Sequence, residues 1–368
     1  MRNLLRVKSA QSLLVALLLV IVAMPAMSDV IRFQEDPNTQ DDSQIPELQV
    51  FGDFSPVERR GNLFLTTTEL SLDTPYEDQV NLAPRQLLTK TLIEGKGDVY
   101  DFVFLFSTSP IKLSVGEFDA TGLYWQIKND VSGIGLPYED QSEDWGSNGK
   151  LQGFIDLGQA TAERLEPQSL AYRFLLETAM HEIMHRWSSY VRYVDHNMEV
   201  RSDLLGHMGS HWNSFVHSQG SVMYGHDWNE LEDGSFRTGP IARRYSDLEL
   251  YLAGFLDRGE VNPILRLRDA SPYLGQFPRA GQVVEATKEF IGIERVIDHE
   301  GSRAPSVDQS QKHFRGAMVI VAKPNEQIPS GFLAALERLR RDIQDRFSFM
   351  TDGRAVLRSS LREFLCSE

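Results

Sequence analysis

"ETAMHEIMHRW", from Glu177 to Trp187, is the stretch of sequence that says most about the fold. It lies in a longer segment, residues 167–193, with apolar residues at helical spacing and no Gly or Pro after the first residue. The spacing predicts one helix of about five turns, apolar around much of its circumference and therefore buried. The residues expected to cover it are Leu170, Phe174, Leu175, Met180, Ile183, Met184 and Trp187.

Two histidines and a glutamate fall in the middle of this apolar helix. His181 and His185 are four residues apart, so a helix places both imidazoles on one face, with Glu182 on the same turn. This is the H-E-x-x-H pattern, in which two ring nitrogens bind zinc and the carboxylate acts on water. Alternatively, both histidines are core residues hydrogen-bonded to backbone or carboxylates, with Glu182 on the surface. Buried polar groups need partners in either case.

A catalytic zinc ion needs a third protein ligand and one open position. The only cysteine is Cys366, so a cysteine-based site is excluded and the ligand is His, Asp or Glu. His211, in "GSHWNSF", is the first choice. Glu249 is the second, either as a ligand or as an outer acceptor that fixes a histidine tautomer. Asp203 and His207 remain candidates, whereas we interpret the following as ordinary loop residues: His196, His217 and His226.

The motif resembles that of the zincin metallopeptidases. "GSVMYG", residues 220–225, is similar to the methionine-containing turn of metzincins, in which Met223 would underlie the metal. The long metzincin motif is absent, because Ser188 and Val191 stand where Gly and His would be expected. The chain also resembles a group of exported bacterial proteins with a His-Glu-x-x-His-Arg-Trp helix, matched further by "GSHW", "SVM" and "YSDLELYLAG". This similarity covers about residues 97–360 and identifies no substrate.

The resemblance implies a mechanism and a place for the substrate. Glu182 would be the general base, and Tyr224, Tyr245 or Tyr251 would stabilise the oxyanion. Zincins bind extended substrates along a sheet edge, and residues 128–137 either border that cleft or form a plain surface loop.

Composition restricts the partners of the protein. The 368 residues are 41% hydrophobic and 24% charged, as in ordinary globular proteins, and the formal net charge is −15. Such an acidic chain is not expected to bind nucleic acid or an anionic membrane surface.

The first 28 residues have the pattern of a signal peptide. A basic start precedes the apolar run Ser12–Met24, and "AMS" supplies small residues for cleavage near Ser28. We therefore expect a secreted or periplasmic protein without stable membrane association after cleavage. The alternative is an uncleaved anchor, for which the apolar run is short.

The remaining chain is expected to be α+β, with a mixed twisted sheet packed on the buried helix. Residues 29–80 are predicted to be an irregular or β-hairpin lead-in, 81–258 a zincin-like catalytic domain, and 259–368 a smaller C-terminal α/β subdomain. Helices are expected at residues 81–95 and 243–256 and from Ser330. Strands are expected at 100–108, 122–130, 151–158 and 314–322, and residues 195–240 are expected to be loop-like.

These features predict an exported zinc-dependent peptidase that binds one Zn²⁺ and hydrolyses protein or peptide substrates. Two alternatives remain open at this stage. One is a non-catalytic zincin-fold binding module with a structural metal, and the other is a zinc hydrolase of a non-peptide bond.

Overall fold

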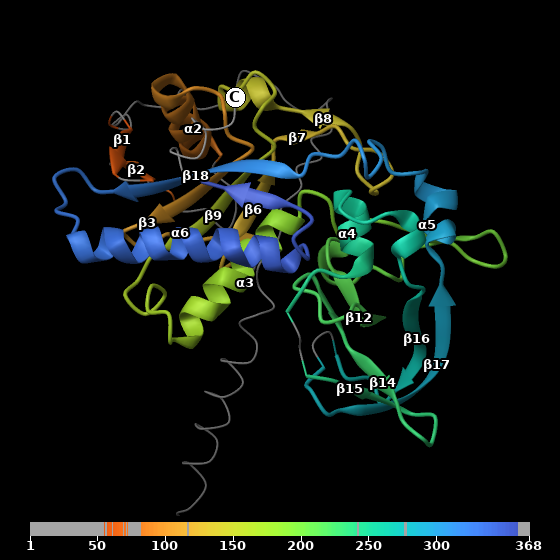
Figure 1. Cartoon of the computed structure of the whole chain (residues 1–368). Helices are drawn as coiled ribbons and strands as arrows, with labels where there is room; N and C mark the ends of the chain where they lie inside the picture. The colour runs from red at the N-terminus through yellow and green to blue at the C-terminus, as the bar shows by residue number, and fades with distance from the viewer. Residues whose placement is uncertain are drawn as a thin grey trace, which may run out of the picture.

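A computed structural model describes residues 55–359, apart from residues 56, 61, 69, 71, 73–81, 116–117, 241–242 and 276–277. The predicted signal peptide, with its cleavage near Ser28, and Cys366 lie outside the described residues. The fold is α+β, as predicted, and is built on two larger sheets (Figure 1). Within the described ranges, no helix combines the length and the apolar character that crossing a membrane would require.

The first sheet is mixed and has the order β1-β2-β18-β3-β9-β6, with β19 also paired to β18. The strands β2, β18, β3 and β9 run parallel to one another, whereas the edge strands β1 and β6 are antiparallel to β2 and β9, respectively. Its strands are β1 (Glu58–Arg60), β2 (Leu63–Thr67), β3 (Phe102–Ser107), β6 (Leu123–Gln126), β9 (Gly153–Gln159), β18 (His313–Ala322) and β19 (Val356–Arg358).

Helices cover both faces of this sheet. Alternate residues of a strand point to opposite faces, and β3 is buried along its whole length. Phe102 and Phe104 belong to the core shared with helices α3 (Leu170–Met184) and α6 (Ser330–Met350). Val103 belongs to the core shared with helix α2 (Ala83–Lys96) on the other side. The result is three layers, in which α2 lies on one face and α3 and α6 lie on the other (Figure 1).

The helix that carries the motif is shorter than predicted. Ser169 caps its first turn by accepting a hydrogen bond from the Tyr172 N–H, and regular helix ends at Met184 with His185 as the C-cap. The 15 residues make about four turns, not five. The prediction extended the apolar pattern through Trp187, which lies in the turn after the helix, and included Leu170, which is 72% exposed.

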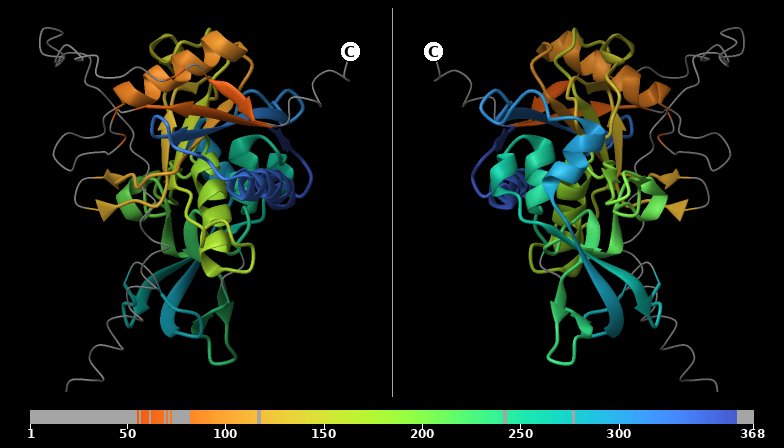
Figure 2. Two further views of the ribbon diagram at one scale, coloured as in Figure 1. Left: turned by 90° about the vertical axis from the view of Figure 1, so that its left-hand side faces the viewer. Right: turned by 90° about the vertical axis from the view of Figure 1, so that its right-hand side faces the viewer.

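Four strands of the second sheet lie within residues 195–240, which were expected to be loop-like, so that prediction is wrong. The other two strands follow residue 259. The order is β13-β12-β16-β17-β15-β14, and the sheet projects from the body of the molecule (Figure 2). Three of its strands are only three residues long, which is too short for an alternation of apolar and polar residues to mark them. They are β12 (Trp212–His217), β13 (Tyr224–His226), β14 (Trp228–Glu230), β15 (Phe236–Thr238), β16 (Ile264–Ser271) and β17 (Val283–Ile291).

The segment after residue 259 contributes to both sheets. The predicted strand at 314–322 is confirmed as β18, and it lies between β2 and β3 in the middle of the first sheet. The predicted amphipathic helix is confirmed as α6, whose buried side packs on α3. The remaining helices are α4 (Asp247–Ala253) and α5 (Ile293–Glu300), with short 3₁₀ helices η2 (Ser142–Trp145), η3 (His207–Gly209) and η4 (Arg258–Glu260).

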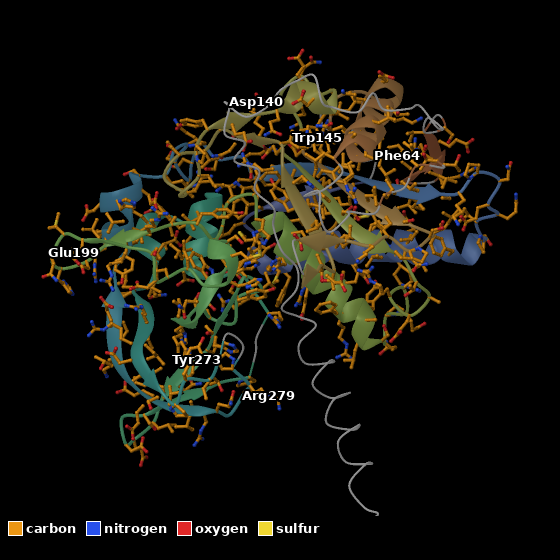
Figure 3. The ribbon with its side chains drawn as sticks, turned by 180° about the vertical axis from the view of Figure 1, so that it is seen from behind. Phe64, Asp140, Trp145, Glu199, Tyr273 and Arg279 are labelled. Atoms are coloured by element: carbon orange, nitrogen blue, oxygen red, sulfur yellow. The ribbon has the colours of Figure 1, made fainter. Side chains whose placement is uncertain are left out.

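Part of the segment 128–137, which was expected either to border the substrate cleft or to form a surface loop, is buried and already paired with another segment. Ser132 exchanges backbone hydrogen bonds with Ala304, at 3.0 and 3.2 Å between N and O, and Ile134 is fully buried. Three small hairpins complete the fold: β4 (Ser114–Val115) with β5 (Phe118–Asp119), β7 (Lys128–Asn129) with β8 (Glu139–Asp140), and β10 (Tyr193–Val194) with β11 (Val200–Arg201). Figure 3 shows Asp140 of β8 and Trp145 of η2 above the first sheet.

Candidate metal centre

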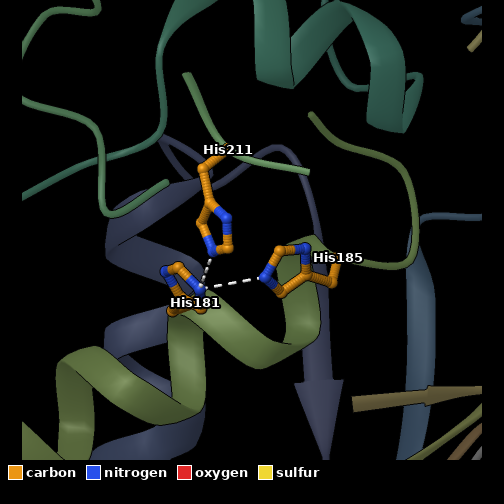
Figure 4. A group of neighbouring side chains, drawn as sticks. All are labelled: His181, His185 and His211. Atoms are coloured by element: carbon orange, nitrogen blue, oxygen red, sulfur yellow. Dashed lines mark hydrogen bonds between the residues drawn. The ribbon is translucent and has the colours of Figure 1, made fainter. Parts of the chain in front are cut away.

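Three histidines from two distant segments meet in the protein interior. His181 and His185 come from the last turn and the C-cap of α3, and His211 immediately precedes β12. All three are buried, and one ring nitrogen of each lies within 4.8 Å of the others (Figure 4). The three histidines can therefore hold a metal ion.

The ring atoms that converge are the Nε2 nitrogens. The distance from His181 Nε2 is 2.9 Å to His185 Nε2 and 3.1 Å to His211 Nε2. Two nitrogens bound to one tetrahedral zinc ion at about 2.0–2.1 Å would be about 3.3 Å apart. The observed separations are within a few tenths of an ångström of that value.

The opposite nitrogens of the rings determine the tautomers. His181 Nδ1 lies 2.7 Å from the carbonyl oxygen of Val222, and His211 Nδ1 lies 3.0 Å from that of His207. A carbonyl oxygen can only accept, so both Nδ1 atoms must donate their protons. In neutral rings, both Nε2 atoms then present lone pairs.

His185 fits the same arrangement through a tyrosine. The Tyr190 hydroxyl donates to the His185 carbonyl oxygen at 2.9 Å and lies 3.3 Å from His185 Nδ1, where its oxygen can accept. Three lone pairs directed at one point repel one another unless a cation lies between them. Outer partners that hold the Nδ1 proton are typical of histidines that bind metal through Nε2.

Glu182 is fully buried beside the edge strand of the first sheet. A Cβ atom added to Gly122, just before β6, would lie 3.0 Å from Glu182 Oε1 and 2.6 Å from Thr178 Cγ2. Glycine at position 122 therefore leaves the room that the Glu182 side chain occupies. The alternative with Glu182 on the surface is wrong.

The segment around Met223 forms a wall of the centre. Met223 is fully buried, and its carbonyl oxygen accepts from the Trp212 N–H at 2.9 Å, next to His211. Val222 supplies the carbonyl that holds His181. The Met223 segment therefore fixes His181 of α3 and also holds the residue next to His211.

Of the three candidate tyrosines, only Tyr224 is adjacent to the histidines. Its ring stacks on that of His211, with centroids 4.4 Å apart, and its backbone adopts a positive φ of 70°. Non-glycine residues rarely adopt that conformation, so the surrounding contacts must hold Tyr224 there. Tyr245 instead donates to the Met180 carbonyl oxygen, and Tyr251 accepts from the Arg303 N–H. Burial raises the pKa of Tyr245 well above its ordinary value.

Glu249 supports the centre from outside. Its Oε1 accepts from Trp212 Nε1 at 2.7 Å and from the Ser221 hydroxyl, and its Oε2 accepts from the Ser246 N–H. Ser221 Oγ in turn accepts from the Met223 N–H at 2.8 Å. Burial raises the pKa of Glu249 to about 7, against the effect of these donors. Its contacts are with the neighbours of the ligands, and the expectation that it binds the metal or a histidine is not supported.

The other candidate ligands lie elsewhere. Asp203 accepts from the Tyr193 hydroxyl and pairs with Arg266. The His207 ring lies 5.6 Å from that of His211, but the contact that fixes His211 is made by the His207 carbonyl. Neither belongs to the cluster that can hold a metal, and neither do His196, His217 and His226.

Sequence reasoning missed the partners that orient the ligands. Tyr190 comes after the end of α3, where helical spacing no longer says which way a side chain points. Val222 and His207 contribute backbone oxygens, which no residue pattern specifies.

No family model, curated protein or solved structure matches the chain.

Proposed function

We propose that the chain is an exported zinc-dependent peptidase, with His181, His185 and His211 as the zinc ligands. The observation that carries the proposal is the convergence of three Nε2 nitrogens whose rings are held at Nδ1 by other protein groups. In the described part of the chain, three ligand side chains converge, which is the number in catalytic zinc sites. Structural zinc sites usually have four.

The ligand type favours zinc or another first-row transition metal over magnesium and calcium. Three imidazoles suit zinc and other first-row transition metals, whereas magnesium and calcium prefer oxygen ligands. When bound, zinc would polarise the scissile carbonyl and lower the pKa of water towards neutrality.

Glu182 is the proposed general base. It follows His181 directly on α3, and its carboxylate is buried beside β6 rather than directed to solvent. Glu182 would take a proton from the attacking water and pass it to the leaving nitrogen as the peptide C–N bond breaks. Tyr224, stacked on His211, is the tyrosine proposed to stabilise the negative charge on the carbonyl oxygen.

A zincin-like fold is part of the same proposal. A mixed sheet with an antiparallel edge strand packs on the helix that carries both histidines, and the segment at Met223 lies against the centre.

Metal analysis together with peptide cleavage tests the proposal. We expect about one zinc ion per purified chain and cleavage of a peptide library. Glu182→Gln should retain zinc and lose at least about 10²-fold in cleavage rate. Glu177→Gln is the matched control, because Glu177 lies on the same helix and pairs with Arg243 outside the centre. Cleavage that survives in Glu182→Gln would exclude Glu182 as the base, and a protein that binds no zinc would exclude the centre.

A further inference from the structure

A cleft of about 270 Å³ lies beside the metal centre. Tyr224, which stacks on His211, is one of its lining residues, and so are His207 and Trp212. Small-molecule pockets usually measure about 300–1,000 Å³. This cleft is therefore suited to one large side chain, held next to the Tyr224 ring that stacks on His211.

Aromatic rings share the lining of the cleft with polar groups: Phe215 belongs to β12, and Tyr273 follows β16. Phe215 of β12 stacks on Trp228, with ring centroids 5.6 Å apart, and so is held in place. Tyr273 lies 6.0 Å from Phe215 and is 73% exposed, so its ring stands at the mouth of the cleft. Figure 3 labels Tyr273 near the strands of the second sheet.

The cleft offers no charged group to a ligand. None of the described residues that line it is Asp, Glu, Lys or Arg. Its polar lining includes the Asn213 amide and the Ser214 hydroxyl, which are uncharged. A charged side chain entering the cleft would lose water without gaining an ion pair, which is costly. An aromatic side chain would gain ring contacts with Phe215 and Tyr273.

We infer that this cleft is a specificity subsite that binds an aromatic side chain of the substrate, close to the bond that is cleaved. The inference rests on the proposed peptidase function, and it names the substrate class for the same centre. It assigns Tyr273 and Phe215 to substrate selection rather than to metal binding or proton transfer.

Tyr273→Ala tests the inference, with Tyr138→Ala as its control. Both tyrosines are exposed, at 73% and 68%, so neither substitution should unfold the protein, and Tyr138 is not a lining residue. For peptides with Phe or Tyr beside the cleaved bond, Tyr273→Ala should lower kcat/KM about two- to tenfold. Peptides with Ala there should be unaffected, and Tyr138→Ala should change neither series.

A binding measurement separates this inference from the proposed catalysis. N-acetyl-phenylalaninamide should give saturation-transfer NMR signals with zinc-loaded Glu182→Gln, and Tyr273→Ala should weaken them. N-acetyl-lysinamide and N-acetyl-alaninamide should give weaker signals. Aromatic binding without any peptide cleavage would contradict the peptidase proposal and support the cleft. Cleavage that prefers Lys, Glu or Gly at this position, or an equal loss for all peptides in Tyr273→Ala, would overturn the subsite.

Discussion

The two halves of the metal centre are built in different ways. His181, Glu182 and His185 are placed by one helix, so their mutual geometry follows from spacing within five residues. His211 and Tyr224 are placed by the parallel pairing of β12 with β13, in which Trp212 is opposite Tyr224. The helical half is thus fixed by a single helix, whereas the strand half forms only when two separate segments, at Trp212 and Tyr224, pair with each other.

The comparison implies that the strand half needs more external support. The Met223 segment, Trp212 and Ser221 form a chain of hydrogen bonds that ends on the buried Glu249 carboxylate. The helical half is held from outside α3 by two contacts, the Val222 carbonyl at His181 and the Tyr190 hydroxyl at His185. Substitutions in each half should separate these two kinds of support.

Loss of His211 is expected to have the largest effect. His211→Ala removes one of three ligands, so zinc affinity should fall by more than the 10- to 100-fold that is typical of outer-partner changes. Isothermal titration calorimetry with metal-stripped protein measures the zinc affinity. His196→Ala is the control, because His196 is exposed. If His211→Ala binds zinc as tightly as the parent, the strand half does not contribute a ligand.

Glu249 should make the stability of the strand half depend on pH. The ordinary pKa of the group is 4.5, and burial raises the pKa to about 7 in the folded protein. Between these values the folded state holds more protons, so its stability should fall as pH rises, by up to about 3 kcal/mol from this group.

Urea unfolding of metal-free protein at several pH values measures this dependence. In Glu249→Gln, the free energy of unfolding should no longer fall between pH 4.5 and 7 by the amount that Glu249 contributes. Taking the difference between parent and variant removes the contribution of His226, whose pKa burial lowers to about 4 and which acts in the opposite direction. Equal slopes in both proteins would contradict the assignment.

Gly122→Ala should disturb the helical half through Glu182. The new methyl group would meet Thr178 Cγ2 at 2.6 Å and Glu182 Oε1 at 3.0 Å, so we expect a loss of about 1–3 kcal/mol in stability and slower cleavage. Gly95→Ala is the control, because a Cβ there meets nothing within 4 Å, and alanine should stabilise α2 slightly. Thermal unfolding and peptide cleavage would show whether the two variants differ as expected.

Tyr190→Phe should have the smallest effect. It removes the hydroxyl near His185 Nδ1 and leaves the ligand itself, so zinc affinity should fall about tenfold. Tyr172→Phe, which removes a hydroxyl bonded to Asp342 on the other side of α3, should leave zinc binding unchanged. Unchanged affinity in Tyr190→Phe would mean that α3 alone orients His185.

The same difference explains what the sequence could predict. The motif helix, the strand at β3 and the amphipathic α6 have strong local periodicity, and each was placed within a few residues. The second sheet was missed because three of its strands have only three residues, and because β12 and β15 each pair with a strand more than forty residues away. The position of His211 and the resemblance predicted it as a ligand. The backbone carbonyls that hold His181 and His211 could not be predicted, because no residue type marks them.

The most direct test is zinc K-edge X-ray absorption of the purified protein, since it reports the ligands of the ion itself. We predict one zinc ion with three imidazole nitrogens at about 2.0–2.1 Å and one further light ligand. His181→Ala, His185→Ala and His211→Ala should each reduce the imidazole contribution or abolish binding. A protein that binds no zinc, or one whose spectrum is unchanged in His211→Ala, would contradict this prediction.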